Sequence, residues 1–198
     1  MRAPAGIYRL YRRFCASTRG VAGIEFAMIL PVLAIMFLGS FDGGRAIAIY
    51  MKVRSATYTL SAIVNQYETI QASDMTSITG ATAVVLAPYS SSPVVVTITQ
   101  IAISSKGAAT VAWSYSQGGT AHTQGAAITI PSNITTLATP SGSGTFNYVI
   151  FAEVSYTFTP MFGYFTSGNI NFSDNLYVTP RSSSCIVYVP QQNATACT

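Results

Sequence analysis

An apolar run from Val21 to Phe41 constrains this chain more than any other feature, and its only charged residue is Glu25. As a helix rising about 1.5 Å per residue, the run would cover about 32 Å, which is enough to cross the hydrocarbon core of a bilayer. Pro31 lies at its centre and predicts a kink or the loss of one helical hydrogen bond. We therefore expect a transmembrane helix over residues 21–41, preceded by a basic leader over residues 1–20.

The distribution of basic residues predicts the orientation of this helix. Five of the ten basic residues precede the apolar run, without any acidic residue among them: Arg2, Arg9, Arg12, Arg13 and Arg19. The positive-inside rule then places residues 1–19 in the cytoplasm and the C-terminal bulk outside. Arg45, Lys52 and Arg54 follow the run and weaken this asymmetry. A short basic tail beside an apolar segment fits membrane topology better than nucleic-acid binding, so we expect no nucleic-acid partner.

The composition narrows the class of protein. Of the 198 residues, 49% are hydrophobic and 8% are charged, whereas roughly 25% are charged in an average soluble domain. Such a low charge content excludes the disordered class and most cytosolic enzymes. An envelope or assembled protein remains, with a surface made polar by Ser, Thr, Asn and Gln, and the length allows one domain plus a membrane anchor.

Beyond the apolar run, the pattern favours continuation of the helix as a stalk over residues 42–70. Residues 46–67 contain no proline or glycine, and four large apolar side chains fall near one face: Ile47, Tyr50, Met51 and Tyr58. Residues at this spacing share one side of a helix. We therefore expect a weakly amphipathic stalk helix that continues the membrane helix.

From about residue 80 the chain becomes rich in Thr, Val, Ile, Ser and Tyr. We expect strands over residues 94–103, 111–115, 148–158 and 185–189. The first two are joined by a turn at residues 104–107 and form a hairpin candidate. Sequential strands joined by short turns indicate an antiparallel sheet. The predicted fold class is α+β, with a long N-terminal transmembrane and stalk helix packed against a C-terminal antiparallel β-sheet domain over residues 71–198.

Residues 1–41 allow three interpretations. A cleaved secretory signal needs a small-x-small cleavage site, but residues 39–42 (Gly-Ser-Phe-Asp) form a poor one. An uncleaved signal anchor explains the length and the basic flank, but it gives Glu25 no role, although an ionisable residue within a span is expensive and usually functional. A basic leader, Gly20, four residues, Glu25-Phe26 and an apolar helix is the layout of a prepilin-type processing site. This third interpretation explains all three features.

Four separated segments carry a resemblance to one family. They are Gly-Val-Ala-Gly-Ile-Glu-Phe at 20–26, Val-Ala-Trp-Ser-Tyr at 111–115, Tyr-Thr-Phe-Thr-Pro-Met-Phe at 156–162, and Pro180-Arg181. In these segments the chain resembles the TadE-like minor pseudopilins of the bacterial tight-adherence (Flp) pilus system. The resemblance implies a pilin-like fold with an N-terminal helix on a sheet domain. The loops at 116–145 match nothing in the family pattern.

The resemblance also implies a function and a set of partners. A prepilin peptidase would cut between Gly20 and Val21, and Glu25 and Phe26 would then take part in helix docking, with the carboxylate meeting the N-terminal amine of a neighbouring subunit. The protein would be a non-enzymatic, single-pass component of the bacterial inner membrane with a cytoplasmic N-terminus. Its expected partners are the major pilin, other minor pseudopilins and the inner-membrane pilus assembly platform. The alternative is an unprocessed, membrane-anchored binding or adhesion module.

Catalytic and metal-binding patterns are nearly missing from the sequence. The single histidine, His122, lies in a Gly/Thr/Gln-rich stretch, and no Gly-x-Ser-x-Gly pattern accompanies the many serines. Cysteine, histidine and carboxylate residues do not fall at metal-ligand spacings, and no phosphate-binding loop occurs. We therefore expect no enzymatic activity, no cofactor and no metal.

The three cysteines separate by compartment. Cys15 lies in the predicted cytoplasmic leader, where a structural disulfide is disfavoured. Cys185 and Cys197 lie twelve residues apart in the predicted exported part, where pairing is favoured. We expect a disulfide between them, with two free thiols as the alternative.

Aromatic residues are plentiful outside the apolar run, and we expect most of them in the sheet core or between helix and sheet. The set comprises Trp113, Tyr156, Phe158, Phe162, Tyr164 and Phe165. The cluster at 161–165 has an alternative interpretation as an exposed contact with a subunit or a surface.

Overall fold

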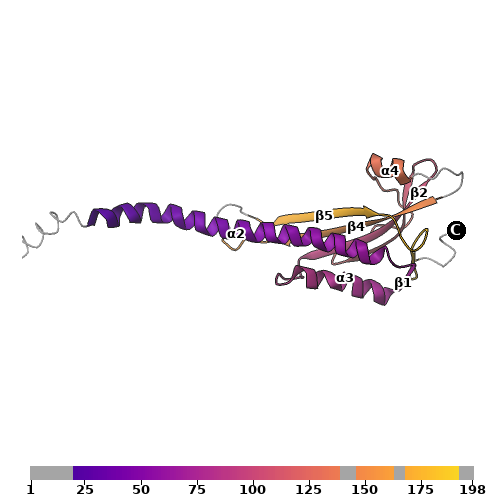
Figure 1. Cartoon of the computed structure of the whole chain (residues 1–198), viewed down its shortest axis with the longest axis horizontal. Helices are drawn as coiled ribbons and strands as arrows, with labels where there is room; N and C mark the ends of the chain where they lie inside the picture. Colours follow the sequence, from indigo (N-terminus) through magenta and orange to yellow (C-terminus); the bar gives the residue numbers. More distant parts are fainter. Residues whose placement is uncertain (1–19, 139–145, 163–167, 192–198) are drawn as a thin grey trace, which may run out of the picture. The chain divides into compact units, whose positions relative to one another are not determined.

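The computed structural model describes residues 20–138, 146–162 and 168–191 (Figure 1). It divides into two compact units, Met1–Gly44 with Met161–Ser167, and Arg45–Pro160 with Gly168–Thr198. Helix α2 (Val21–Val64) contributes its first part to the first unit and its second part to the second. Most of the predicted basic leader, including Cys15, lies outside the described residues.

Helix α2 is continuous over 44 residues and passes through Pro31. The stalk that was predicted over residues 42–70 is helical as far as Val64, where α2 ends. The two residues Gln66 and Tyr67 form a tighter turn, in which their N–H groups donate to the carbonyls of Ile63 and Val64 at 3.2 Å each. Hydrogen bonds to the third preceding residue commonly tighten the end of a helix.

The second unit contains a four-stranded antiparallel sheet in the order β3-β2-β4-β5. Its strands are β2 (Val94–Ser104), β3 (Ala109–Gln117), β4 (Phe146–Phe158) and β5 (Ile170–Val178). The predicted hairpin is confirmed by the pairing of β2 with β3, in which Ile98 faces Tyr115. The predicted α+β class, with a long N-terminal helix and a C-terminal antiparallel sheet, is therefore confirmed.

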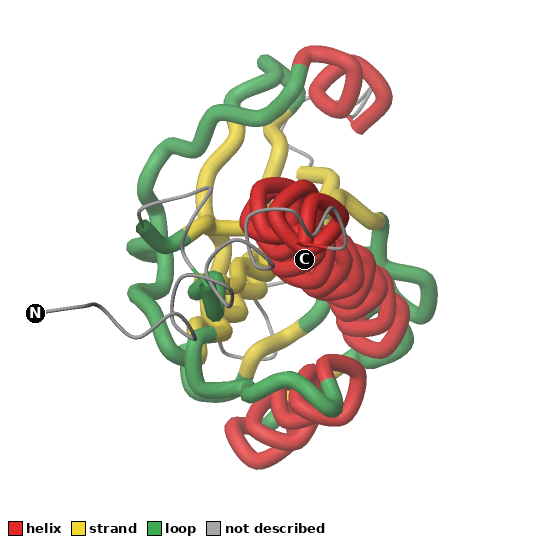
Figure 2. Tube along the Cα trace, turned by 90° about the vertical axis from the view of Figure 1, so that its left-hand side faces the viewer, coloured by secondary structure: helices red, strands yellow, loops and turns green. Residues whose placement is uncertain are grey.

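One face of the sheet packs against the second part of α2 and against helix α3 (Ala72–Leu86), and both helices are visible beside the strands in Figure 2. The core between helices and sheet contains Leu60 of α2, Met75 of α3, Ile98 of β2 and Trp113 of β3, all at most 1% exposed. Trp113, Tyr156 and Phe158 thus lie in the core, as the sequence predicted.

The opposite face of the sheet carries a smaller apolar cluster. Its buried members are Ile101, Ile103, Val149 and Phe151. Phe151 stacks on Tyr177 of the edge strand with ring centroids 4.4 Å apart. Helix α4 (Ser132–Ala138) and the segment before it cover part of this face with three isoleucines: Ile128 and Ile130 before the helix and Ile134 within it. The residues at 116–145 that match no family pattern thus supply part of a second core.

The last predicted strand forms, but it joins a different sheet. Strand β6 (Val187–Tyr188) pairs in parallel with strand β1 (Thr69–Ile70) instead of extending the main sheet. Side chains of the main sheet hold the preceding residue, Ile186. Its N–H donates to Gln100 Oε1 at 2.7 Å, and its carbonyl accepts from Trp113 Nε1 at 2.8 Å.

Helix α3 and strand β5 are elements that the sequence analysis did not predict. The sequence of α3 is rich in Thr and Ser and contains Gly80, residues that are poor in helix interiors. The hydroxyls of Thr76, Ser77 and Thr79 instead donate to carbonyls four residues earlier, at 2.8–3.0 Å. Because α3 buries Met75 and Leu86 completely, tertiary packing overrides its weak propensity.

Candidate helix-docking site

The four residues predicted to serve processing and docking all lie at the beginning of α2. Gly20 directly precedes the helix, and Val21 is its first residue. A side chain at position 20 would meet no other atom within 4 Å, so packing does not explain a glycine there. Val21 and Glu25 are four residues apart and therefore lie on the same face, about one turn from each other. A new amine at Val21 would thus form within a turn of the Glu25 carboxylate.

Among the residues that the structure describes, none covers the apolar side chains at positions 21–37. Every residue from 21 to 37 is exposed, and large side chains on all sides of the helix are open, including Phe26 at 59%, Met28 at 76% and Phe37 at 71%. The helix is long and apolar enough to cross a membrane. A helix that is apolar on all sides is stable in a large core or in lipid, and the described part of this chain does not supply such a core for residues 21–37.

Glu25 is the exception in this apolar surface. Its side chain is exposed, and within residues 20–138, 146–162 and 168–191 no hydrogen bond or ion pair joins it. A carboxylate in lipid is costly unless a cation and hydrogen bonds satisfy it. Within the described residues, the Glu25 carboxylate therefore lacks the cation that it would need in lipid.

The far end of the apolar stretch is marked by Asp42. Its carboxylate accepts hydrogen bonds from the backbone N–H groups of Met161 and Phe162, at 3.2 and 3.0 Å. The ring of Phe162 also contacts that of Phe41, edge to face, with centroids 6.2 Å apart. This connection between residues about 120 positions apart was not predicted from the sequence.

The second part of α2 has one buried and one open face. Its buried face packs in the core of the second unit through Ile49, Val53, Ala56, Leu60 and Val64. Of the four residues predicted to share a face, Ile47 (60%), Met51 (64%) and Tyr58 (48%) lie on the other side and are exposed. Tyr50 (44%) lies at the border, where its ring contacts Phe172 of β5 with centroids 6.1 Å apart. The apolar face noted in the sequence is thus open except at Tyr50.

A comparison with protein-family models identifies the same helix. The model described as TadE-like protein matches residues 20–60, which extends from Gly20 to near the end of α2. This match confirms the resemblance to TadE-like proteins. Together with the apolar helix, it supports a membrane protein associated with the tight-adherence pilus. Comparisons with curated proteins and with solved structures gave no match.

The TadE-like segment contains Gly20, Val21, Glu25 and Phe26, as well as the exposed face of the second part of α2. The other family-like segments, at 111–115, 156–162 and 180–181, lie outside the match. Two of them have a clear structural place: Trp113 lies in the core, and the N–H groups of Met161 and Phe162 bind Asp42.

His122 has a carboxylate partner, although the arrangement is not that of a catalytic triad. His122 Nε2 lies 2.9 Å from Glu153 Oε2, and both side chains are more than one-third exposed. Ser114 Oγ accepts a hydrogen bond from the backbone N–H of His122 and not from its ring. Among the described residues, no three His, Cys, Asp or Glu side chains cluster in a way that would hold a metal ion.

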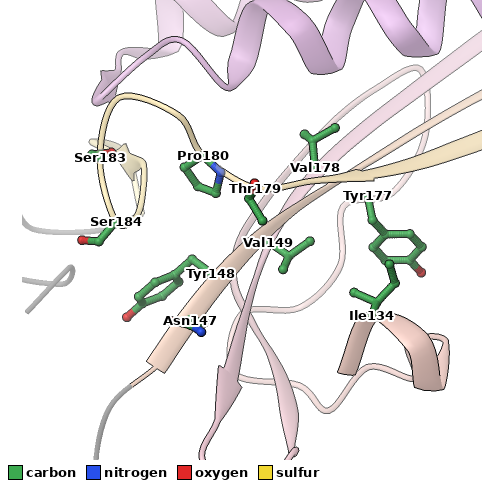
Figure 3. A pocket seen from close by; sticks show the side chains of 10 residues that line it. All are labelled: Ile134, Asn147, Tyr148, Val149, Tyr177, Val178, Thr179, Pro180, Ser183 and Ser184. Atoms are coloured by element: carbon green, nitrogen blue, oxygen red, sulfur yellow. The ribbon is translucent and has the colours of Figure 1, made fainter. Parts of the chain in front are cut away.

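A cavity of about 380 Å³ opens beside β4, β5 and α4 (Figure 3). Tyr148 and Tyr177 line it together with Ile134, Pro180 and two serines, and its lining includes no carboxylate, histidine or basic side chain. Burial raises the pKa of both tyrosines above its usual range. Their hydroxyls therefore stay protonated at neutral pH, which suits binding better than proton abstraction.

Cys185 is buried at 2% exposure and takes part in a disulfide bond. Cys197 lies outside the described residues, so its predicted pairing with Cys185 stays a prediction. The same holds for Tyr164 and Phe165 of the predicted aromatic cluster, whereas Met161 (69%) and Phe162 (37%) are exposed.

Proposed function

We propose that this protein is a TadE-like minor pseudopilin, a non-enzymatic component of tight-adherence (Flp) pilus assembly anchored in the bacterial inner membrane. Its N-terminus would be cytoplasmic and its sheet domain periplasmic or extracellular. One observation carries the proposal: the TadE-like segment begins with an exposed apolar stretch, residues 21–37, whose single carboxylate, Glu25, has no partner in the described part of the chain.

Processing by a prepilin peptidase between Gly20 and Val21 would create the cation that Glu25 needs. The new amine would lie at the N-terminus of α2, where the helix dipole already favours a carboxylate and disfavours a cation. Within one subunit, Val21 and Glu25 share a face, so the carboxylate can approach its own amine or that of a neighbour. A neighbour's amine would link the two helices, because a buried carboxylate is tolerable only when it is paired.

The exposed face in the second part of α2 would continue the same contact outside the bilayer. Ile47, Met51 and Tyr58 follow each other at four- and seven-residue intervals and stay exposed although the opposite face is buried. Apolar residues at such intervals form a stripe into which another helix can pack. The major pilin or another minor pseudopilin would supply that helix, and the inner-membrane assembly platform would hold the pair.

A different class of function has its own supporting observation. The cavity lined by Tyr148 and Tyr177 has the volume of a small-molecule site, and it fits an anchored binding or adhesion module in which α2 is only a tether. Leader processing separates the two functions, since a tether does not need to be cut.

The intact mass of the membrane-extracted protein tests processing directly. In cells with an active prepilin peptidase, we expect a mature chain that begins at Val21. Gly20→Leu should block the cut and leave the leader attached, although position 20 has room for a side chain. A wild-type protein that always retains Met1 would favour the tether.

Glu25 is tested by substitution with a matched control. Glu25→Ala should leave membrane levels unchanged or slightly higher, because a charge leaves the apolar helix, while pilus numbers should fall strongly. Glu68→Ala removes another exposed carboxylate, outside the apolar run, and should leave piliation unchanged. Normal piliation by Glu25→Ala at normal protein levels would exclude an assembly role for Glu25.

A further inference from the structure

The Asp42 side chain fastens the segment after strand β4 to the membrane helix. Asp42 accepts the N–H groups of both Met161 and Phe162 through different carboxylate oxygens, Oδ1 at 3.2 Å and Oδ2 at 3.0 Å. Hydrogen bonds to an ionised carboxylate are about twice as strong as neutral ones. The backbone of this segment is thereby fixed beside the last turn of the apolar run.

The same arrangement removes two polar groups from an unfavourable position. Backbone N–H groups near hydrocarbon must be satisfied within the protein, since lipid offers no hydrogen-bond acceptors. Asp42 accepts a hydrogen bond from both, one at each carboxylate oxygen. The backbone at 161–162 can therefore approach a bilayer without exposing an unpaired donor.

The side chains of the fastened segment remain open. Met161 is 69% exposed and Phe162 is 37% exposed, and Phe162 lies edge to face against Phe41, which is 50% exposed. Phe37 lies four residues before Phe41, on the same face of the helix, and is 71% exposed. These residues continue the apolar surface of the span without a break.

We propose that Met161 and Phe162, fastened by Asp42, form a lipid-contacting element at the outer boundary of the bilayer, next to α2. The inference rests on the proposed membrane span. If the span begins at Val21, about 32 Å of helix ends at Phe41, so Asp42 lies where hydrocarbon gives way to headgroups. Amphipathic Trp and Tyr rings are enriched at that depth, whereas the wholly apolar side chains of Met161 and Phe162 would lie on its hydrocarbon side. Lipid is the occupant because the exposed cluster is continuous with the surface of the span itself.

Tryptophan variants in liposomes test this contact. The full-length protein would carry Phe162→Trp, or Leu33→Trp in the middle of the span, in vesicles whose lipids bear bromine near the headgroups or near the bilayer centre. We expect at least twofold quenching of the added Phe162→Trp fluorescence by shallow bromine and weaker quenching by deep bromine. Leu33→Trp should show the reverse order. The native Trp113 is fully buried and supplies the unquenched baseline.

The role of Asp42 is tested in the same vesicles. Asp42→Ala combined with Phe162→Trp should lose most of the shallow quenching, because the segment is no longer fastened. Asp42→Asn keeps one oxygen acceptor and should lose less. Val84→Trp, at an exposed apolar position in α3 (79%), controls for exposure alone and should be quenched less than Phe162→Trp.

The outcomes distinguish this inference from the proposed function. Quenching of Leu33→Trp without quenching of Phe162→Trp would overturn the lipid contact and leave the span intact. Absence of quenching at both positions would overturn the span. The introduced tryptophan of Phe162→Trp could be protected from quenching at high protein concentration and lose that protection as the protein is diluted in lipid. This result would show that a second copy of the chain covers Met161 and Phe162, and it would overturn the lipid contact.

Discussion

The two parts of helix α2 use apolar side chains in opposite ways. In residues 21–37 every position is exposed, whichever side of the helix it occupies. In the second part, apolar and small residues recur every three or four positions and are at most 1% exposed: Ile49, Val53, Ala56, Leu60 and Val64. One helix thus contains a surface that is apolar all round and a surface with one buried face.

This difference in exposure indicates which surfaces pack against each part of α2. The second part packs within its own chain, and small residues at Ala56, Thr57 and Ser61 allow the sheet and α3 to approach. The hydroxyls of Thr57 and Ser61 are satisfied inside the helix, at 3.0 Å to the carbonyl of Val53 and 2.8 Å to that of Thr57. The first part has no such partner in the described chain. If the first part spans a membrane, as we propose, lipid and other helices would supply the contacts that stabilise it.

The largest expected difference between the two parts of α2 is in how much a leucine-to-alanine substitution lowers the free energy of unfolding. Leu60→Ala creates a cavity in the core of the second unit and should lower the free energy of unfolding by about 2–5 kcal/mol. Leu33→Ala removes the same atoms from a side chain that is 50% exposed. This substitution should change the free energy of unfolding by less than about 0.5 kcal/mol. Denaturant titration in detergent, followed by the fluorescence of the buried Trp113, measures both.

Similar losses for the two leucine variants would contradict the separation of the helix into two environments. Leu33→Ala should instead affect the lateral contacts of the span.

We expect a smaller loss of stability when the contact between Lys52 of α2 and the end of α3 is removed. Lys52 Nζ donates to the carbonyls of Val85 and Ala87, at 2.9 and 2.7 Å, at the C-terminal end of α3. Lys52→Met keeps the aliphatic stem and removes the charge, so the free energy of unfolding should fall by about 1–2 kcal/mol. Arg54→Met is the matched control. The Arg54 guanidinium lies on the ring of Tyr58 at 5.8 Å and is solvent-exposed, so its removal should change stability by at most about 0.5 kcal/mol.

An equal loss of unfolding free energy in Lys52→Met and Arg54→Met would show that the positive charge alone stabilises the second unit, and not the hydrogen bonds of Lys52 to the end of α3. Hydrogen exchange of the α3 amides gives an independent measurement, since loss of the cap should speed exchange in the last turn of α3 first.

The sequence predicted those elements whose local residue pattern matches the structure that they adopt in the folded protein. The β2–β3 hairpin and strand β4 were predicted because Val, Ile and Tyr dominate them and because a turn separates the first two. Helix α3 was missed since its Thr and Ser residues mimic a strand, and β5 was missed since its exposed positions are polar. Both depend on packing that no local pattern reveals.

The candidate site divides in the same way. The start of α2, with Glu25 five residues after Gly20, is a local pattern and could be read directly. The binding of Asp42 to Met161 and Phe162 joins segments about 120 residues apart, so neither segment predicts it alone. The sequence did predict that the span ends at residue 41 and gave residues 161–165 an interpretation as a contact, but it did not predict that the two segments meet.

The smallest predicted effect concerns the open face of the second part of α2. Met51 is 64% exposed and Val53, two residues later, is fully buried. Val53→Ala should lower the free energy of unfolding by about 1–3 kcal/mol, whereas Met51→Ala should change it by less than about 0.5 kcal/mol. If the open face docks another helix, Met51→Ala should nevertheless weaken crosslinking between α2 and a neighbouring pseudopilin in membranes. A large loss of stability in Met51→Ala would mean that this face packs within the chain, and then only the first part of the helix would be left to bind partners.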